Sequence, residues 1–245
     1  TNQPAALFAA ECQVITKDWI GLQRSLQNQN WGALEFSRHA FLARSLRGQG
    51  LEGAFQAEWD LARNTANPEN VSSPMFDANL KWLFVNAISW KWQREAEQIL
   101  WTVVNKYPDD KSAADYLAQA LIKSGRTRSL MELLNIQFRR DSSNLAAKNN
   151  LAMVAMLLNA DELKPYDLAH QVYEKDPTNS SYASTYAFSL YLQGKNADAL
   201  KVFQQLPPQT LQDPAIAGYC GLVLKANGDQ AKAKAYLELS AKAQL

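Results

Sequence analysis

Apolar and polar residues follow one another along most of this chain with the period of amphipathic α-helices, and the helical stretches come in pairs. The clearest pair spans residues 182–208, where two short amphipathic patterns meet at Gly194. No stretch shows the two-residue alternation, bounded by turn residues, that is typical of a β-strand. The pattern predicts an all-α fold with about 14 helices.

The residue expected between paired helices recurs at a nearly constant interval. Such residues are Gly50, Gly125, Asn159, Gly194 and Gly228. The last four recur at an interval of about 34 residues, which is the period of a known helical repeat. Counting back one such interval from Gly125 reaches Lys91, so we place a further turn there. The stretch from Gly50 to Lys91 is longer than one interval, and we expect the extra residues to form a loop near residues 67–74.

Three further series of residues keep the same period. A large apolar residue is expected in the second helix at Trp59, Leu100, Leu134, Leu168, Phe203 and Leu237. A small residue recurs in the first helix at Ala43, Ala118, Ala152, Ala187 and Gly221. An apolar residue follows three positions later, at Leu46, Ala87, Leu121, Ala155, Leu190 and Leu224. Phe84 alone breaks the series of small residues. The agreement of these series sets the register of the hairpins.

These markers resemble the tetratricopeptide repeat (TPR) family, whose unit is a 34-residue helix-turn-helix with a small residue in the first helix and a proline at its end. The resemblance covers the chain from about Phe36 onward and implies a right-handed α-solenoid of antiparallel helix hairpins. Six hairpins are expected, at residues 36–76, 77–110, 111–144, 145–179, 180–213 and 214–245. Lys164-Pro165 stands where a small residue is usual, and we expect this proline in the first turn of its helix.

Residues 1–35 match the register less well, and we expect them to form either N-terminal capping helices or a degenerate repeat. Helices are predicted at residues 4–16 and from 17 or 18 to 28. A third helix is predicted over residues 31–49, with Asn30 as its N-cap. The absence of an initiating Met leads us to expect a processed or trimmed chain. At the other end, the apolar face of the last helix leads us to expect either that the chain continues beyond Leu245 or that another molecule covers this face.

The overall charge excludes a general attraction to nucleic acid or acidic lipid. The chain has 25 Lys and Arg and 24 Asp and Glu residues, a formal net charge of +1. Reading of RNA by a basic inner groove is therefore disfavoured, and no nucleic-acid partner is expected. No apolar run is long enough to span a bilayer, so we expect no direct membrane insertion. The two cysteines, Cys12 and Cys220, do not suggest a disulfide framework, and Cys220 lies on a predicted buried face. The sequence assigns no compartment.

No local motif indicates catalysis, a metal or a cofactor. The GxGxxG pattern at residues 48–53 follows a helical segment, so we interpret it as a turn between helices and not as a dinucleotide loop. His39 and His170 lie in different hairpins, and neither is expected to bind zinc. No nucleophile elbow is present. The chain is predicted to be non-enzymatic and without a catalytic, metal or cofactor site.

Several aromatic and acidic residues are assigned by their positions on the predicted helices. Trp82 and Trp101 are expected to pack in the core, whereas Trp90 and Trp92 at the turn are expected to form a partly exposed contact patch. Glu95, Glu97 and Glu162 are expected to be solvated charges in first helical turns. Two glycosylation sequons, at Asn70 and Asn179, carry little weight because the pattern is short.

The TPR resemblance also implies where a ligand would bind, because in that family the first helices line the concave face. The corresponding residues here are Arg44, Arg47, Lys81, Val85, Asn149, Met153, Met156, Ser184, Phe188 and Tyr191. They suggest a groove that is basic at its N-terminal end and apolar in its middle, suited to an extended or helical peptide. The alternative is that these residues pack against one another within the superhelix.

The sequence thus predicts a non-enzymatic TPR-like scaffold that binds a protein or peptide through its concave helical face. A second interpretation stays open, in which the chain is the repeat portion of a larger polypeptide and positions an enzymatic or membrane-anchored part outside it. The Lys, Asn and Arg pattern with which some TPR proteins hold an acidic C-terminal tail is not matched. The identity of the partner cannot be read from these residues.

Overall fold

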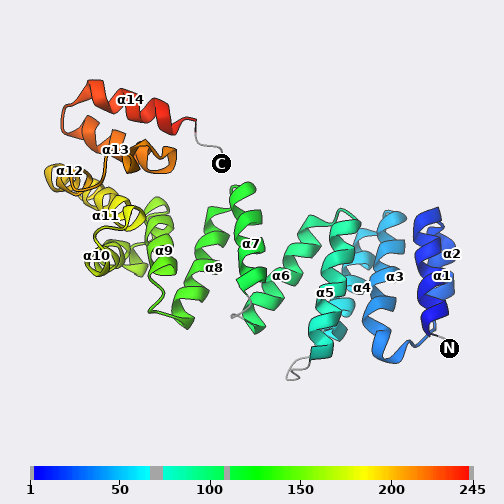
Figure 1. Ribbon diagram of the computed structural model, residues 1–245. Coiled ribbons are helices and arrows are strands. Elements are labelled where there is room, and N and C mark those ends of the chain that lie inside the picture. The colour runs from blue at the N-terminus through cyan, green and yellow to red at the C-terminus, as the bar shows by residue number, and fades with distance from the viewer. Residues whose placement is uncertain (1–2, 67–73, 108–110, 243–245) are drawn as a thin grey trace. The chain divides into compact units, whose positions relative to one another are not determined.

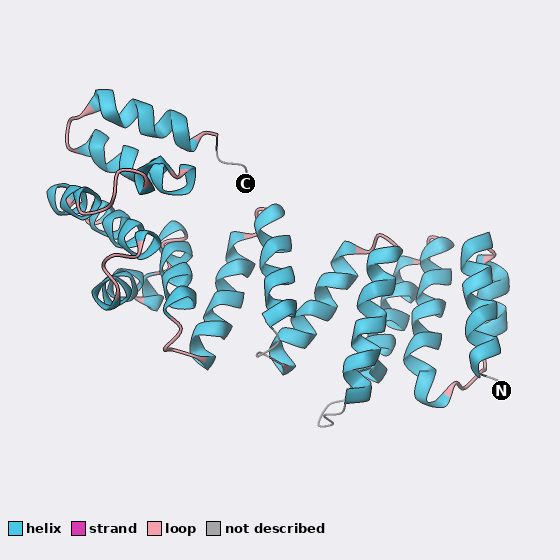
Figure 2. Cartoon of the chain, viewed as in Figure 1, coloured by secondary structure: helices cyan, strands magenta, loops and turns pink. Residues whose placement is uncertain are grey.

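The computed structural model describes residues 3–66, 74–107 and 111–242, and this part of the chain contains fourteen α-helices, three short 3₁₀ helices and no strand (Figure 2). The α-helices are α1 (Gln3–Thr16), α2 (Trp19–Leu26), α3 (Glu35–Gly48), α4 (Glu52–Ala66), α5 (Pro74–Ser89), α6 (Gln93–Lys106), α7 (Lys111–Lys123), α8 (Thr127–Arg140), α9 (Leu145–Leu157), α10 (Pro165–Lys175), α11 (Ser180–Leu192), α12 (Asn196–Gln204), α13 (Pro214–Ala226) and α14 (Gln230–Ser240). The all-α prediction is confirmed.

The helices pack as consecutive antiparallel hairpins, which fall into two compact units (Figure 1). Unit 1 covers Thr1–Tyr107 and contains the hairpins α1/α2, α3/α4 and α5/α6. Unit 2 covers Pro108–Leu245 and contains α7/α8, α9/α10, α11/α12 and α13/α14. Within each unit, helices of neighbouring hairpins are in contact. The predicted architecture of helix hairpins is therefore confirmed.

One turn geometry joins every pair. The residue in the left-handed region is Lys17, Gly50, Lys91, Gly125, Asn159, Gly194 or Gly228, with φ between 52° and 87°. In the turn at Gly194, the Lys195 N–H donates to the Leu190 carbonyl over 2.9 Å and the Gly194 N–H to the Tyr191 carbonyl over 2.9 Å. The same pattern recurs at the other six turns and caps the carbonyls left free at a helix end. The turn predicted at Lys91 by counting is confirmed.

The N-terminal hairpin follows the same register. Lys17 takes the left-handed conformation between α1 and α2, about one repeat interval before Gly50. Ala10 and Leu26 occupy the positions of the small and large markers, and both are buried. The α1/α2 hairpin therefore keeps the register of the hairpins that follow it.

The start of α3 differs from the prediction. The helix begins at Glu35 and not at Trp31, and a 3₁₀ helix at Gly32–Leu34 precedes it. The Asn30 side chain accepts the Gly32 N–H over 2.8 Å, so it closes a local turn and does not cap a helix. Glu35 accepts the Trp31 N–H over 2.8 Å, which fixes Trp31 in a fully buried position ahead of the helix.

The marker residues form the seam between helices. Ala43, Ala152 and Ala187 are fully buried, and a Cβ atom added at Gly221 would come within 2.8 Å of the Leu237 side chain. Such close helix packing explains why this series is small. The six apolar residues three positions later are all buried, and so are the second-helix markers except Leu237, which is half-buried. Ala118 is also half-buried.

Proline positions agree with the hairpin boundaries where the structure describes them. Pro165 is the first residue of α10, after the 3₁₀ helix Asp161–Leu163 and Lys164 in the left-handed region, as expected for a proline in a first turn. The predicted loop at residues 67–73, with the sequon at Asn70, lies outside the described residues, as does Pro108. Asn179, the other sequon residue, is the N-cap of α11 and accepts the Ser181 and Tyr182 N–H groups.

Candidate protein-binding surface

Arg44, one of the predicted groove residues, lies half-buried on α3 among three indole rings of unit 1. Its guanidinium carbon is 4.8 Å from the ring centroid of Trp19, 5.6 Å from Trp92 and 5.9 Å from Trp90. Trp19 packs directly on Gly48, and its carbonyl accepts the Ser45 hydroxyl over 2.6 Å. These contacts fix the rings around the cation, which their electron-rich faces attract.

No carboxylate of the described residues pairs with Arg44. Its Nε atom is buried without a hydrogen-bond acceptor in this part of the chain. Burial lowers the pKa of the Arg44 guanidinium, and the neighbouring charge of Arg47 lowers it further. A guanidinium remains protonated at neutral pH, so Arg44 is a positive charge without a balancing anion. Such a group is stabilised when a partner brings a carboxylate to it.

Arg47, the other predicted basic residue of the groove on α3, is engaged within the protein. Its Nη2 atom is 2.8 Å from Glu52 Oε1 and 2.9 Å from Glu95 Oε1. Burial acts to lower the pKa of Arg47, but its hydrogen bonds to Glu52 and Glu95 outweigh this and raise it. The guanidinium also lies 3.7 Å from the ring centroid of Phe55. Arg47 therefore links α3 to α4 and α6.

The prediction that Glu95 is a solvated charge is wrong. Its side chain is buried, and its partner is Arg47 from a helix 48 residues earlier in the chain. A buried carboxylate needs such a partner because desolvation without one is costly. The pairing connects the hairpins α3/α4 and α5/α6, a contact that local sequence patterns do not reveal.

The expected contact patch at Trp90 and Trp92 is also wrong for Trp92, which is 5% exposed. Its ring packs against Phe55 and Trp59 at centroid distances of 5.0 Å and 5.6 Å and against Trp90 at 4.9 Å. Trp92 follows the left-handed Lys91, where the chain turns back over the hairpin and directs this residue inward. Trp90 is half-buried.

Trp82 and Trp101 differ in their surroundings. The Trp82 ring packs against Phe36 and Phe41 at 5.6 Å and 5.7 Å, as expected for a core residue. Trp101 is half-buried, and its Nε1–H donates to Glu97 over 3.1 Å. Both indoles thus contribute to internal packing or bonding and are not part of the Arg44 surroundings.

Helix α5 presents an exposed apolar face beside a lysine. Val85 and Ile88 are 54% and 52% exposed, and Lys81 is exposed one turn before Val85. In the repeat register Val85 and Ile88 correspond to Arg44 and Arg47 on α3, and α3 and α5 are in contact. We refer to Arg44, Lys81, Val85 and Ile88 as the Arg44 surface. It combines a cation held by indoles with accessible aliphatic side chains.

The predicted groove residues of unit 2 are mostly not accessible. Asn149, Met156, Ser184 and Phe188 are buried, and Met153 and Tyr191 are half-buried. The Phe188 ring lies 4.9 Å from Tyr219 of α13, the next first helix, and 6.1 Å from Tyr191 of its own helix, so both tyrosines pack against it. The alternative of self-packing therefore describes this face of unit 2 better than an open apolar groove.

Two histidines complete the set of candidate chemical groups. His39 Nδ1 is 2.6 Å from Glu58 Oε2, and His39 Nε2 is 3.5 Å from Glu35 Oε1. Glu35 also pairs with Arg38; burial acts to raise the pKa of Glu35, but these hydrogen bonds and charges lower it. The contacts of His39 with Glu35, four residues earlier on α3, and with Glu58 of the other helix were not predicted from the sequence. The group is an ion-pair network within the α3/α4 hairpin.

The remaining motifs are turns or surface groups. Gly50 of the GxGxxG pattern lies in the turn between α3 and α4, with no strand before it, which excludes a dinucleotide loop at that position. His170 is 3.6 Å from Glu174 on the surface of α10. Within the described residues no three His, Cys, Asp or Glu side chains are arranged to hold a metal ion. None of the described helices has both the length and the apolar character needed to cross a membrane.

No protein-family model and no curated protein matches the sequence. Among solved structures, a MamA protein is 11% identical with a TM-score of 0.47, over 67% of this chain and 90% of that chain. A thermophilic TPR protein in Thermus thermophilus is 17% identical with a TM-score of 0.46, over 67% of this chain and 92% of that chain.

A tetratricopeptide repeat protein from Parabacteroides merdae is similar over nearly the whole length of both chains. It is 15% identical with a TM-score of 0.42, over 98% of this chain and 99% of that chain. The protein's own helix pairs and its regularly spaced turns identify it as a TPR-like array of helix hairpins.

Proposed function

We propose that this protein is a non-enzymatic scaffold that binds a segment of another protein at the Arg44 surface of unit 1. The segment carries an acidic side chain next to apolar residues. The observation that carries the proposal is Arg44, a half-buried cation that three indoles surround and no carboxylate of the described residues neutralises.

An acidic group in the partner follows from the electrostatics of α3. Arg47 is neutralised by Glu52 and Glu95, whereas the charge that acts on Arg44 is that of Arg47, which repels it. A partner carboxylate would remove this imbalance and form charge-assisted hydrogen bonds with the guanidinium. Partial burial of the site reduces screening by salt compared with a fully exposed charge.

Apolar residues in the partner follow from the chemistry of α5. Val85 and Ile88 expose aliphatic groups to solvent on the same helix face as Lys81. Covering such side chains is favourable by about 25 cal/mol per Å² of apolar surface. An amphipathic helix or an extended strand with one acidic and several apolar residues can satisfy both α5 and Arg44. The role requires no cofactor.

A peptide selection tests the proposal directly and also yields a ligand for measurement. A random peptide library displayed on phage is selected on the immobilised chain, and parallel selections use the variants Arg44→Gln and Val85→Asp. The matched control is Arg24→Gln, a change at an exposed arginine of α2. We expect peptides enriched in Asp or Glu beside Leu, Ile or Phe on the wild type and on the control.

The two site variants separate the parts of the proposal. Arg44→Gln is expected to abolish enrichment of the acidic position, and Val85→Asp to abolish enrichment of the apolar positions. Circular dichroism of each variant checks that the helices are intact. Enrichment of the same peptides on Arg44→Gln as on the wild type would contradict the assignment of the site.

A further inference from the structure

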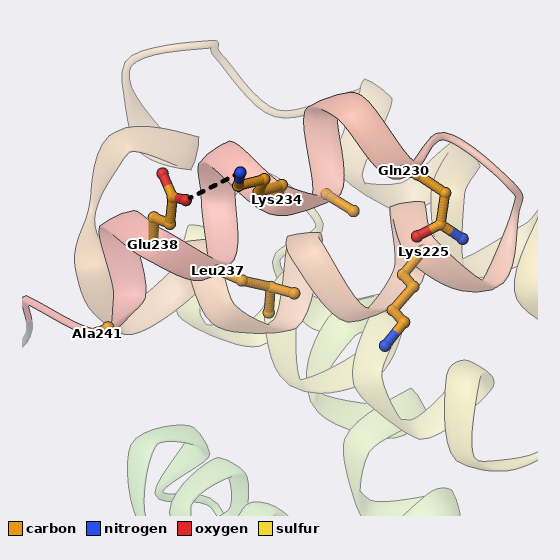
Figure 3. Close-up of a pocket in the computed structure, with 7 residues that line it drawn as sticks. Lys225, Gln230, Lys234, Leu237, Glu238 and Ala241 are labelled. Carbon is orange, nitrogen blue, oxygen red and sulfur yellow. Dashed lines mark ion pairs between the residues drawn. The ribbon is translucent and has the colours of Figure 1, made fainter.

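The last hairpin leaves an open groove at the C-terminal end of unit 2. The groove has a volume of about 420 Å³ and is lined by residues of α14, by Ala241 directly after it and by Lys225 of α13 (Figure 3). Ala233 and Leu237 form its apolar floor, while Lys234 and Glu238 stand beside it 3.8 Å apart. Leu237 is half-buried, although it is the second-helix marker of this hairpin.

The same groove is filled in the preceding hairpin. Ala199 and Phe203 of α12 correspond to Ala233 and Leu237 of α14, and both are buried. They belong to one core cluster with Ile216 of α13, and α13 contacts both helices of the α11/α12 hairpin. The first helix of a following hairpin is therefore the kind of structure that fits the open α13/α14 groove.

Helix α1 exposes the complementary face at the other end of the chain. In α13 the positions that face the preceding hairpin are Ile216, Cys220 and Val223, and in α9 they are Ala147, Leu151 and Val154. All six of these residues are buried. The residues of α1 in the same register, Ala5, Ala9 and Cys12, are all exposed.

Large apolar residues extend this face. Phe8 and Ile15 of α1 are 67% and 79% exposed, and Ile20 at the start of α2 is 59% exposed. Phe8 and Ile15 follow the helical spacing of Ala5 and Cys12, and several large exposed apolar side chains within one hairpin are typical of an interaction surface. Glu11 is the only charged residue of α1, whereas Lys225 and Lys234 line the groove with Glu238 as the single acidic group.

From these two surfaces we infer that the chain assembles head to tail, with α1 of one copy seated in the α13/α14 groove of the next. Each copy carries both halves of an interface that repeats the packing between its own hairpins. The apolar face of α1 covers Ala233 and Leu237, and Glu11 lies toward the lysines of the groove. Because the two halves differ, the contact is heterologous, and a dimer formed through one such contact retains one free half of each kind.

Two double variants test the interface, and each of them disrupts a different half. Phe8→Gln with Ile15→Gln removes the apolar face of α1, and Lys225→Glu with Lys234→Glu reverses the charge of the groove. All four residues are exposed, so the fold is expected to persist. Leu61→Gln is the matched control, because Leu61 is an exposed leucine of α4 that belongs to neither surface.

Sedimentation velocity over a concentration series measures the outcome. We expect the wild type and Leu61→Gln to form species that grow beyond dimers with concentration, and each double variant to dissociate at least about tenfold more readily, which corresponds to 1.4 kcal/mol. An equimolar mixture of the two double variants is expected to form a dimer that does not grow, since only one intact interface remains.

Two results would overturn the inference. One is a wild-type chain that stays monomeric at its highest soluble concentration, which would leave these faces to a different occupant, such as a further segment of a longer chain. The other is self-association in which the mixed variants form no dimer. Both results are independent of the Arg44 surface, so they do not affect the proposed function.

Discussion

The two units use the same hairpin and the same turn but fill them with different side chains. Unit 1 buries large aromatic residues, including Trp31, Trp59 and Phe55, and connects its hairpins through the Arg47–Glu95 ion pair. Unit 2 relies on Ala, Leu and Val, with Phe203 as its one aromatic side chain among the largest fully buried ones described. Repeat register thus specifies the backbone and leaves the chemistry of the seam free to vary.

The difference extends to the first-helix positions expected to bind a ligand. In unit 1 these positions hold an unneutralised Arg44 and exposed aliphatic residues on α5, whereas in unit 2 they hold Met156 and Phe188, which neighbouring helices bury. Equivalent positions therefore differ in what they offer a partner. The comparison favours unit 1 as the place where a ligand is held.

The largest expected effect concerns the aromatic seam. Trp59→Ala and its register equivalent Phe203→Ala should each lower the free energy of unfolding by about 3–5 kcal/mol, because both side chains are fully buried. We expect the larger decrease for Trp59→Ala, since the Trp59 ring also packs on Trp92 and its Nε1–H donates to Gln98 over 3.1 Å. Urea denaturation measures both, with Leu61→Ala as an exposed control. Equal losses under about 1 kcal/mol would contradict this account of the seam.

The ion pair across the hairpins of unit 1 gives the next effect. Among the carboxylates that the structure describes, Glu95→Ala leaves Arg47 with the exposed Glu52 alone, and it should lower the free energy of unfolding by about 3 kcal/mol. Glu97→Ala, a change at a half-buried neighbour on α6, is the control and should lower the free energy of unfolding by less than Glu95→Ala does. A denaturation midpoint for Glu95→Ala that matches Glu97→Ala would show that the pair is dispensable.

A third effect is specific to unit 2 and depends on pH. Burial raises the pKa of the Cys220 thiol to about 11 from its ordinary value of 9.0. Below pH 9 the thiol is neutral in both states, so its contribution to stability is complete there. Between pH 9 and 11 the unfolded chain ionises first, and stability should fall by up to about 2 kcal/mol. Cys220→Ala should show a shallower decline, and an identical pH profile would refute the assignment.

The smallest expected effects on the free energy of unfolding come from substitutions at equivalent turn positions, one in each unit. Gly194→Ala in unit 2 should lower the free energy of unfolding by about 1 kcal/mol, because φ is 75° at that position. Lys91→Gly in unit 1 should raise it by about 0.5 kcal/mol, since Lys91 bears the strain that glycine avoids. Thermal unfolding of both variants checks the signs. A lower free energy of unfolding for Lys91→Gly would mean that the Lys91 side chain stabilises the fold by more than its left-handed backbone conformation destabilises it.

The sequence predicted the backbone well because the turn geometry depends on local residues. Spacing alone placed the left-handed turn at Lys91, although lysine gives no turn signal of its own. The start of α3 was missed because the Asn30 side chain can close a short turn as readily as it can cap a helix. Local patterns do not distinguish these two uses of Asn30.

The candidate site was less predictable because it depends on contacts between hairpins. Register placed Arg44 and Arg47 on one face, but it did not show that Glu95, 48 residues later, neutralises only Arg47. Likewise, register placed Phe188 on the predicted ligand-binding face, but it did not show that Tyr219 of the next hairpin packs against this ring. Pairing across the fold decides which side chains remain free for a partner.

The most direct test of the central claim is a titration of a selected acidic-apolar peptide into the chain, followed by tryptophan fluorescence, because Arg44 lies among three indoles. We predict a saturable change in the wild type and in Arg24→Gln, and a dissociation constant at least about tenfold higher in Arg44→Gln, equivalent to 1.4 kcal/mol. Equal dissociation constants for the wild type and Arg44→Gln would contradict the claim that Arg44 anchors the partner.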